Sequence, residues 1–300
     1  MPNSSTKRLI KYAAAGLGGL AILYAGLSAL GARFSMEILR VPVKGSPDDV
    51  GLAYEDVAFM SRDGAVRLRG WFLPGQKHRA ILIVHGGDEN RIDENVDTLP
   101  LARDLVAKGY CVLTFDLRGR GESEGKGLSL SNIESDIGGA MEYLAGRGYP
   151  PASVGILGFC SGAASACIYA SRNPAGAVVL DGCFIDVPTM VVREAASVGI
   201  PEFLVRIFMP GLKLMTRLLY GYRVIDPVGV VRDVASPILF IREEYEEFIN
   251  RGEIQRLYEA SANPADETWE VEGALHSQSY RTAPGRFIER VDEFISKHIK

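Results

Sequence analysis

Cysteine is scarce in this sequence, and its spacing argues against a zinc site. The 300 residues include four cysteines, and none belongs to a CxxC pair or to a Cys/His cluster with metal-ligand spacing. We therefore expect no structural metal. Cys111, Cys167 and Cys183 fall in predicted strands and helices, where free cysteine usually acts as a small buried apolar residue.

Signatures of nucleic-acid and nucleotide binding are also lacking. Lys and Arg are scattered along the chain and the net charge is -4, so no basic stripe is present that could neutralise phosphates. No dinucleotide fingerprint and no P-loop occurs, and no motif requires a cofactor. With 47% hydrophobic and 23% charged residues, the composition is that of an ordinary folded protein with one sizeable core.

Residues 12–32 form an apolar run without charge, long enough to cross the core of a bilayer. A secretory signal would have a shorter apolar region and a clearer cleavage site than the weak candidate near Ala29 and Gly31. We therefore favour an uncleaved, single-pass anchor that contacts membrane lipid. The basic residues before the run outnumber the mixed charges after it, which predicts a cytoplasmic amino end and an extracytoplasmic folded domain.

The rest of the chain alternates predicted strands and helices. After a linker at 41–51, a hairpin with its turn at Asp63 and Gly64 is expected over 57–75. Apolar strands are predicted at 80–84, 110–116, 154–159, 175–181, 236–241 and 268–272, with amphipathic helices between and after them. This order implies an α/β fold with a mostly parallel sheet, helices on both faces, and ligands at the carboxyl ends of the strands.

An apolar, helix-forming stretch interrupts this alternation and predicts a helical cap at about 184–222. Its Phe, Met and Leu residues fit packing against the sheet domain, and alternatively a substrate pocket or a membrane contact. We divide the chain into an anchor and the start of a linker at 1–40 and a folded domain at 41–300 that includes the cap.

The strongest motif is Gly158-Phe159-Cys160-Ser161-Gly162, which lies where a predicted strand becomes a helix. Its G-x-nucleophile-x-G spacing and this context resemble the nucleophile elbow of the α/β-hydrolase superfamily. The resemblance extends from about Val57 to the end of the chain and includes the arginine-glycine turn at 116–123. It implies the α/β-hydrolase fold. The family generally has serine at this position, and cysteine marks a minority that includes dienelactone-hydrolase-like enzymes.

Cysteine at the amino end of a helix is a reasonable nucleophile, because the helix dipole and a nearby imidazolium favour the thiolate. An exposed thiol is unusual outside a reducing compartment, which weighs against the extracytoplasmic orientation. Two alternatives stay open. Cys160 is a packing residue without a catalytic role, or Ser161 is the nucleophile. The resemblance implies an oxyanion hole from the backbone N–H groups of Ser161 and Gly87, with His85 orienting the loop.

The resemblance places the catalytic histidine after the last strand, where this sequence has His276. The other histidines outside the His85 loop, His78 and His298, are weak candidates. The orienting acid should follow the strand at 236–241, and the count from the strand selects Glu246. Its neighbours Glu243, Glu244 and Glu247 leave that choice open, and Asp181 is a fallback.

Together these residues predict a membrane-anchored hydrolase that cleaves ester or thioester bonds of a small acyl substrate. It would use a Cys160–His276–Glu246 triad and an acyl-thioenzyme. Transfer of the acyl group to an amine or alcohol by the same cysteine is one alternative. A catalytically silent binding protein that keeps the fold is the other.

Overall fold

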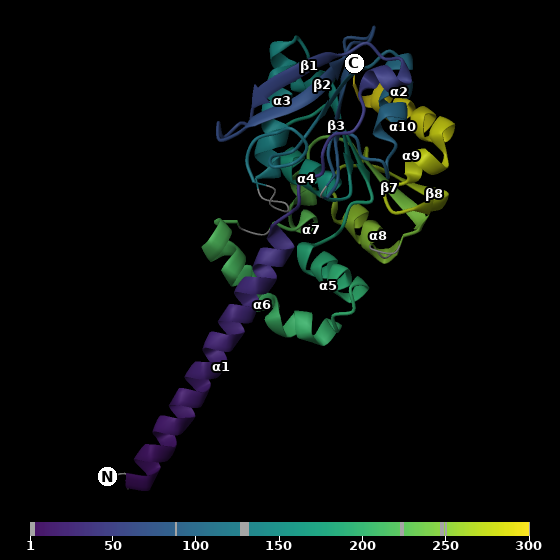
Figure 1. The fold of residues 1–300 in the computed structure, drawn as a ribbon. Coiled ribbons are helices and arrows are strands. Elements are labelled where there is room, and N and C mark those ends of the chain that lie inside the picture. Colours follow the sequence, from purple (N-terminus) through teal and green to yellow (C-terminus); the bar gives the residue numbers. More distant parts are fainter. Residues whose placement is uncertain are drawn as a thin grey trace. The chain divides into compact units, whose positions relative to one another are not determined.

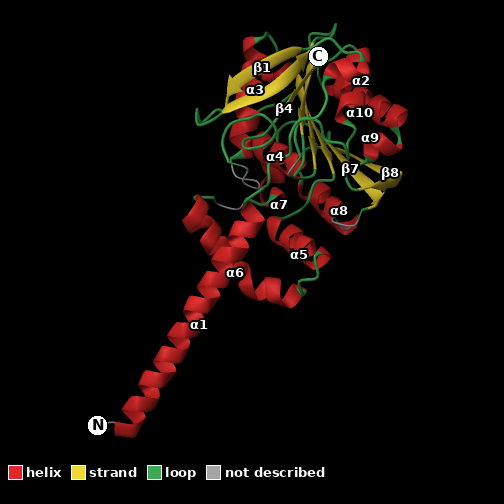
Figure 2. Ribbon diagram, viewed as in Figure 1, coloured by secondary structure: helices red, strands yellow, loops and turns green. Residues whose placement is uncertain are grey.

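An eight-stranded sheet forms the centre of the folded domain in this computed structural model, which describes residues 4–87, 89–126, 132–222, 225–246, 249 and 251–299 (Figure 2). The strands are β1 (Glu55–Met60), β2 (Arg67–Leu73), β3 (Ala80–Val84), β4 (Cys111–Phe115), β5 (Val154–Phe159), β6 (Ala177–Asp181), β7 (Ile238–Tyr245) and β8 (Glu267–Leu275). Their order in the sheet is β1-β2-β4-β3-β5-β6-β7-β8. The β1–β2 hairpin and the β2–β4 pair are antiparallel and all other pairs are parallel, which confirms the predicted mostly parallel sheet.

Helices cover both faces of this sheet, as predicted. The helices are α2 (Thr98–Ala107), α3 (Ile133–Gly146), α4 (Ser161–Ala170), α7 (Pro227–Val230), α8 (Arg251–Ala260), α9 (Ser279–Thr282) and α10 (Pro284–His298), with short 3-10 helices at Pro47–Val50, Pro151–Ser153 and Val231–Asp233. In Figure 1, α3 and α4 lie on one side of the sheet and α2, α9 and α10 on the other. The predicted apolar stripes of α3 and α10 are buried: Ile133, Ile137, Met141 and Leu144, and Phe287, Val291, Phe294 and Ile295.

Strands β3, β4, β5 and β6 are buried along their whole length, because helices cover both of their faces. Parallel neighbours end at the same edge of the sheet. The residues that follow β3, β5, β6, β7 and β8 therefore meet at one edge, where ligands bind in folds of this kind.

Strand β7 continues beyond its predicted end at Ile241 and reaches Tyr245. It pairs with β8 along this extension, with an irregularity between Glu243 and Tyr245. An ion pair between Arg242 and Glu270 joins the two strands there. The cross-strand pairing explains why an acidic, polar segment extends the strand, although its composition indicates a turn.

The chain divides into two compact units, residues 1–37 with 191–224 and residues 38–190 with 225–300. The first unit contains α1 (Ser4–Met36), α6 (Glu202–Tyr220) and most of α5 (Val187–Ser197), so the predicted cap is helical. Within the described residues, one helix is long and apolar enough to cross a membrane, over Ile10–Met36. Both an anchor and a signal sequence have this composition, and the predicted division at residue 41 stays a prediction.

Candidate active site

Cys160 occupies a sharp turn between β5 and α4. Its backbone has φ 49° and ψ -116°, a conformation that residues other than glycine rarely adopt. The strain is compensated by a hydrogen bond from the Cys160 N–H to the Asp181 carbonyl (2.9 Å) and by the first turn of α4, where the Ala164 N–H binds the Cys160 carbonyl (3.1 Å). Cys160 is partly exposed, whereas the other three cysteines are buried.

The glycines on either side of Cys160 are required by close packing. A Cβ atom on Gly158 would lie 2.7 Å from the Ala163 Cα, and one on Gly162 would lie 2.4 Å from the carbonyl oxygen of His85. Either contact would push α4 away from the sheet. The G-x-C-x-G spacing is therefore explained by the turn itself, and the turn directs the thiol out of the core.

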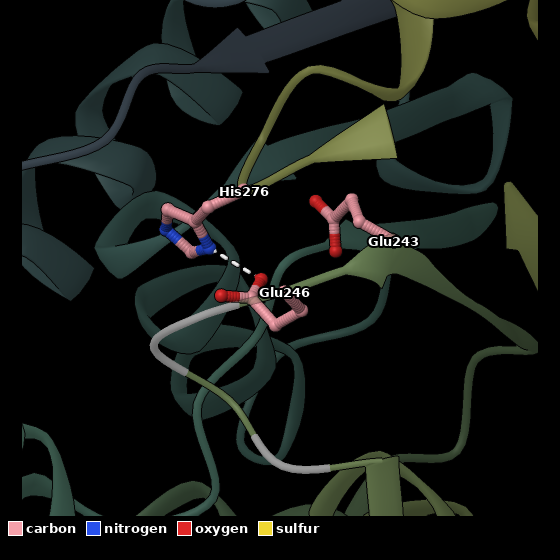
Figure 3. A group of neighbouring side chains, drawn as sticks. All are labelled: Glu243, Glu246 and His276. Atoms are coloured by element: carbon pink, nitrogen blue, oxygen red, sulfur yellow. Dashed lines mark hydrogen bonds and ion pairs between the residues drawn. The ribbon is translucent and has the colours of Figure 1, made fainter. Parts of the chain in front are cut away.

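The imidazole of His276, just after β8, is hydrogen-bonded to Glu246 and lies near enough to Cys160 for that residue to influence its pKa. Its Nδ1 atom lies 2.6 Å from Oε2 of Glu246, which follows β7 (Figure 3). The predicted nucleophile, histidine and acid thus lie together at this edge of the sheet. Asp181, the fallback acid, is instead buried beside Glu243 and Ser279.

Burial by itself would lower the pKa of His276, but two neighbours outweigh it. Cys160 and the carboxylate of Glu246 raise this pKa well above the ordinary value for histidine. The protonated form of the ring is therefore favoured in this arrangement.

Two further carboxyl groups, those of Asp181 and Glu243, are buried near this pair. Glu243 is 1% exposed and Asp181 is fully buried. Burial raises the pKa of Asp181 to about 6, and burial together with Asp181 raises the pKa of Glu243 well above its usual range. The Oδ2 atom of Asp181 and the Oε2 atom of Glu243 find no donor among the described residues, so the hydrogen bond between the two groups needs one of them protonated.

Glu243 also holds the turn that carries His276. Its Oε1 atom accepts the backbone N–H of Ser277 at 2.7 Å, and Ser277 has φ 55°. Glu243, Glu246 and His276 offer ligand atoms within 4.8 Å of one another (Figure 3). The hydrogen bond between His276 and Glu246 already uses atoms that a cation would need, and we assign no metal to this group.

The predicted oxyanion-hole donors lie on the other side of Cys160. The N–H of Gly87 donates to the hydroxyl oxygen of Ser161 at 2.6 Å, so this donor is occupied. The hydroxyl reaches the glycine loop because Ser161 is the first residue of α4, next to the turn.

Buried polar groups fix this glycine loop. His85 accepts the N–H of Leu117 on Nε2 (3.1 Å), and Arg120 donates from Nε to the carbonyl of Gly87 (2.8 Å). Burial and the charge of Arg120 lower the pKa of His85 to about 3, so its ring is neutral. The arginine-glycine turn after β4 thus supports the loop, a role that its sequence pattern did not reveal.

The remaining candidates lie outside this arrangement. Glu244 accepts the N–H of Gly273 (2.8 Å) and is exposed, and Glu247 lies outside the described residues. His298, in α10, packs against Phe294. His78 lies in the segment that precedes β3.

Comparison with known proteins agrees with this geometry. Residues 81–292 match the model of the alpha/beta hydrolase family. The chain belongs to the alpha/beta hydrolase family. Among its relatives, the YqkD protein of Bacillus subtilis is 26% identical over 231 residues, covering 74% of this chain and 72% of YqkD. Human alpha/beta hydrolase domain-containing protein 17C is 27% identical over 189 residues, which cover 63% of this chain and 50% of that protein.

Solved structures place this alpha/beta hydrolase close to esterases. The Pf2001 esterase of Pyrococcus furiosus superposes with a TM-score of 0.74 at 26% identity and covers 89% of this chain and 99% of its own. The alpha/beta hydrolase GrgF of Penicillium has a TM-score of 0.66 at 18% identity, covering 83% of this chain and 99% of its own, and shares the fold. The hydrolase fold and esterase-like neighbours are thus established.

Proposed function

We propose that this alpha/beta hydrolase is a membrane-anchored enzyme that hydrolyses ester or thioester bonds through an acyl group carried on Cys160. One observation carries the proposal: the His276 imidazole is hydrogen-bonded to Glu246 and lies near Cys160 at the elbow, whose influence raises the pKa of the ring. Esterase neighbours of the same fold support the bond type. In most family members serine occupies this position, and a thiolate needs less help from a base than a hydroxyl does.

In the first step, the Cys160 thiolate bonds to the carbonyl carbon of the substrate, and the carbonyl electron pair moves to the oxygen. Collapse of this intermediate breaks the bond to the alcohol or thiol, which leaves with the proton of His276. The products are a thioester on Cys160 and a neutral imidazole that Glu246 keeps in one orientation.

In the second step, neutral His276 takes a proton from water while the water oxygen bonds to the thioester carbon. Collapse releases the carboxylic acid and restores the Cys160 thiolate beside a protonated His276. The backbone N–H of Ser161 would stabilise the oxyanion in both steps, and that of Gly87 would join it once the Ser161 hydroxyl rotates away.

The anchor role is assigned to α1. Its segment Ile10–Met36 has the length and apolar composition of a membrane span, and the side chains described from Ile10 to Leu23 are exposed. A helix of this kind gains stability when lipid replaces water around it. The predicted cytoplasmic amino end follows from the charges next to the span and stays a prediction.

Thiol labelling and ester hydrolysis test the catalytic proposal on the same samples. We expect a p-nitrophenyl ester to protect Cys160 from alkylation, and Cys160→Ala to abolish both labelling and hydrolysis. Because the imidazole assists both steps, His276→Ala should lower the hydrolysis rate by about 10³-fold or more. Cys167→Ala is the matched control, because Cys167 lies buried in the same helix, and burial raises the pKa of its thiol to about 12.

Three outcomes discriminate the alternatives. Labelling kinetics unchanged by His276→Ala would contradict the proposed pair. An acyl group that accumulates on Cys160 in water and leaves on addition of an amine would identify an acyltransferase. Binding of the ester without turnover, in a correctly folded protein, would identify a silent binding protein.

A further inference from the structure

Helix α6, which belongs with α1 to the first compact unit, leaves large apolar side chains exposed to solvent. Those that are at least one-third exposed are Phe203, Leu204, Ile207, Leu214, Leu218 and Leu219. Phe203, Ile207, Leu214 and Leu218 recur at helical spacing and therefore form one stripe along the helix. An apolar stripe of this size on a soluble protein normally marks a contact with another molecule or with a membrane.

Charged residues of α6 gather on a separate stripe. Glu202, Arg206, Lys213 and Arg217 follow one another at intervals that place them on the same side of a helix. Arg206 pairs with Glu202 at 2.6 Å, while Lys213 and Arg217 form no ion pair with any residue in the described part of the chain. The polar side of α6 is therefore basic, as in helices that lie at the surface of anionic membranes.

The third side of α6 packs on α1. The rings of Tyr24 and Phe208 stack with their centroids 5.0 Å apart. Small residues allow the two backbones to approach closely: a Cβ atom on Gly211 would lie 2.1 Å from the hydroxyl oxygen of Ser28, and one on Gly31 would lie 2.8 Å from Leu212. Small residues at the contact are typical of helices that associate within membranes.

A side chain of α1 partners backbone groups of α6 next to Pro210, which lacks an N–H inside the helix. The hydroxyl of Tyr24 contacts both Ile207 and Gly211, donating to the Ile207 carbonyl (3.0 Å) and accepting from the Gly211 N–H (3.1 Å). Such internal pairing is what backbone groups require where water is absent.

We propose that α6 lies in the interface of the lipid bilayer beside α1, with its apolar stripe in the acyl region and its basic stripe toward anionic headgroups. The inference rests on the proposed anchor role of α1 and not on the chemistry of Cys160. Contact with the helix that would cross the membrane, the basic stripe and the Tyr24 hydrogen bonds each favour lipid as the occupant over a protein partner.

The experiment places single tryptophans on the full-length protein in vesicles of phosphatidylcholine and phosphatidylglycerol. The phosphatidylcholine carries bromine on its acyl chains, either near the headgroup or near the methyl end, because bromine quenches tryptophan only in contact. Leu214→Trp reports on the apolar stripe, Lys213→Trp is its matched control on the basic stripe, and Leu20→Trp reports on α1. The unsubstituted protein gives the background of the native Trp71 and Trp269.

We expect Leu214→Trp to be quenched at least severalfold more than Lys213→Trp, and more by bromine near the headgroup than near the methyl end. Leu20→Trp should be quenched whatever the result for α6. Quenching at position 20 without quenching at 214 would overturn the α6 proposal and leave the anchor intact. Absence of quenching at position 20 would overturn both, and neither result bears on hydrolysis. A blue-shifted but unquenched Leu214→Trp would show that protein covers the stripe.

Discussion

The two sides of Cys160 carry two histidines with opposite properties. His85, on the glycine-loop side, lies near Arg120, and burial and that charge lower its pKa to about 3. His276, on the other side, lies between Cys160 and Glu246, and these groups raise its pKa well above the usual value in spite of burial. The groups beside each ring therefore determine which of the two histidines holds a proton more readily.

The difference shows how the site separates its tasks. On the glycine-loop side the His85 ring is neutral. Its Nε2 atom accepts from the Leu117 N–H, and the Gly87 carbonyl accepts from Arg120. The His276 side holds an imidazole with a raised pKa and two buried carboxyl groups whose pKa values are also raised. Substitutions on the second side should therefore change pH dependence, whereas substitutions on the first should change rates without moving pH limits.

Among substitutions that leave Cys160 and His276 in place, Glu246→Gln has the largest expected effect, because it removes the charge but keeps the size of the side chain. We expect kcat to fall by about 10²- to 10⁴-fold, because the amide no longer fixes and stabilises the protonated ring. The alkaline limit of kcat/KM should move to lower pH, since the carboxylate is one of the causes that raise the pKa of His276. A pH–rate profile measures both, and Glu244→Gln, an exposed neighbour, is the control.

The same substitution should change stability in a defined pH window. The pKa of His276 is higher in the folded than in the unfolded protein, so its proton contributes stability that is fully present below the unfolded value and is lost as pH rises through the folded value. Glu246→Gln should weaken this dependence. A thermal unfolding midpoint that falls with pH equally in both proteins would contradict the assigned cause.

Cys160 and His276 can be predicted from the sequence because each lies in a local pattern. Gly158, Cys160 and Gly162 are tied to the turn by contacts that no larger residue permits, and strand-helix alternation places His276 at the same edge. Counting from the expected strand end at Ile241 predicts Glu246. Its carboxylate contacts the His276 ring although β7 continues to Tyr245.

Other parts of the site depend on contacts between distant segments that no local pattern encodes. The Asp181–Glu243 pair joins the ends of two strands, and Glu243 reads in the sequence as one of several solvated acids. The hydroxyl of Ser161 meets a loop 74 positions away. Outside the site, Tyr24 of α1 likewise contacts Ile207 and Gly211 of α6, a helix far from it in the sequence.

A smaller effect is expected from Glu243→Gln, which imitates a carboxyl group that permanently holds its proton. The amide can accept from Ser277 and donate to Asp181, so activity should stay within about threefold of the parent. Glu243→Ala leaves the Ser277 N–H buried without a partner, which costs about 1–3 kcal/mol and loosens the turn of His276. A large loss of activity in the glutamine variant would show that Glu243 works as an ionised group.

The stability of these variants gives an independent check on the shared proton. The raised pKa values mean that the folded pair keeps a proton which the unfolded chain has lost above about pH 4, so the pair makes stability fall as pH rises until it ionises as well. Glu243→Gln should reduce that fall. The thermal midpoints of parent and variant at about pH 5 and about pH 8 measure it.

The smallest effect is expected on the neutral side, from Ser161→Ala. The parent must break the hydrogen bond from the Gly87 N–H to the Ser161 hydroxyl before that N–H can bind an oxyanion, and such a bond contributes about 0.5–1.5 kcal/mol. Removing the hydroxyl should therefore raise the rate of Cys160 acylation by about two- to tenfold with no shift of the pH limits. Burst kinetics with a p-nitrophenyl ester measure that rate, and Ser165→Ala, which removes a hydroxyl that donates to the Ser161 carbonyl in the same helix, is the control. A slower acylation would mean that the hydroxyl itself donates to the oxyanion, so that the neutral side contributes a side chain as well as backbone.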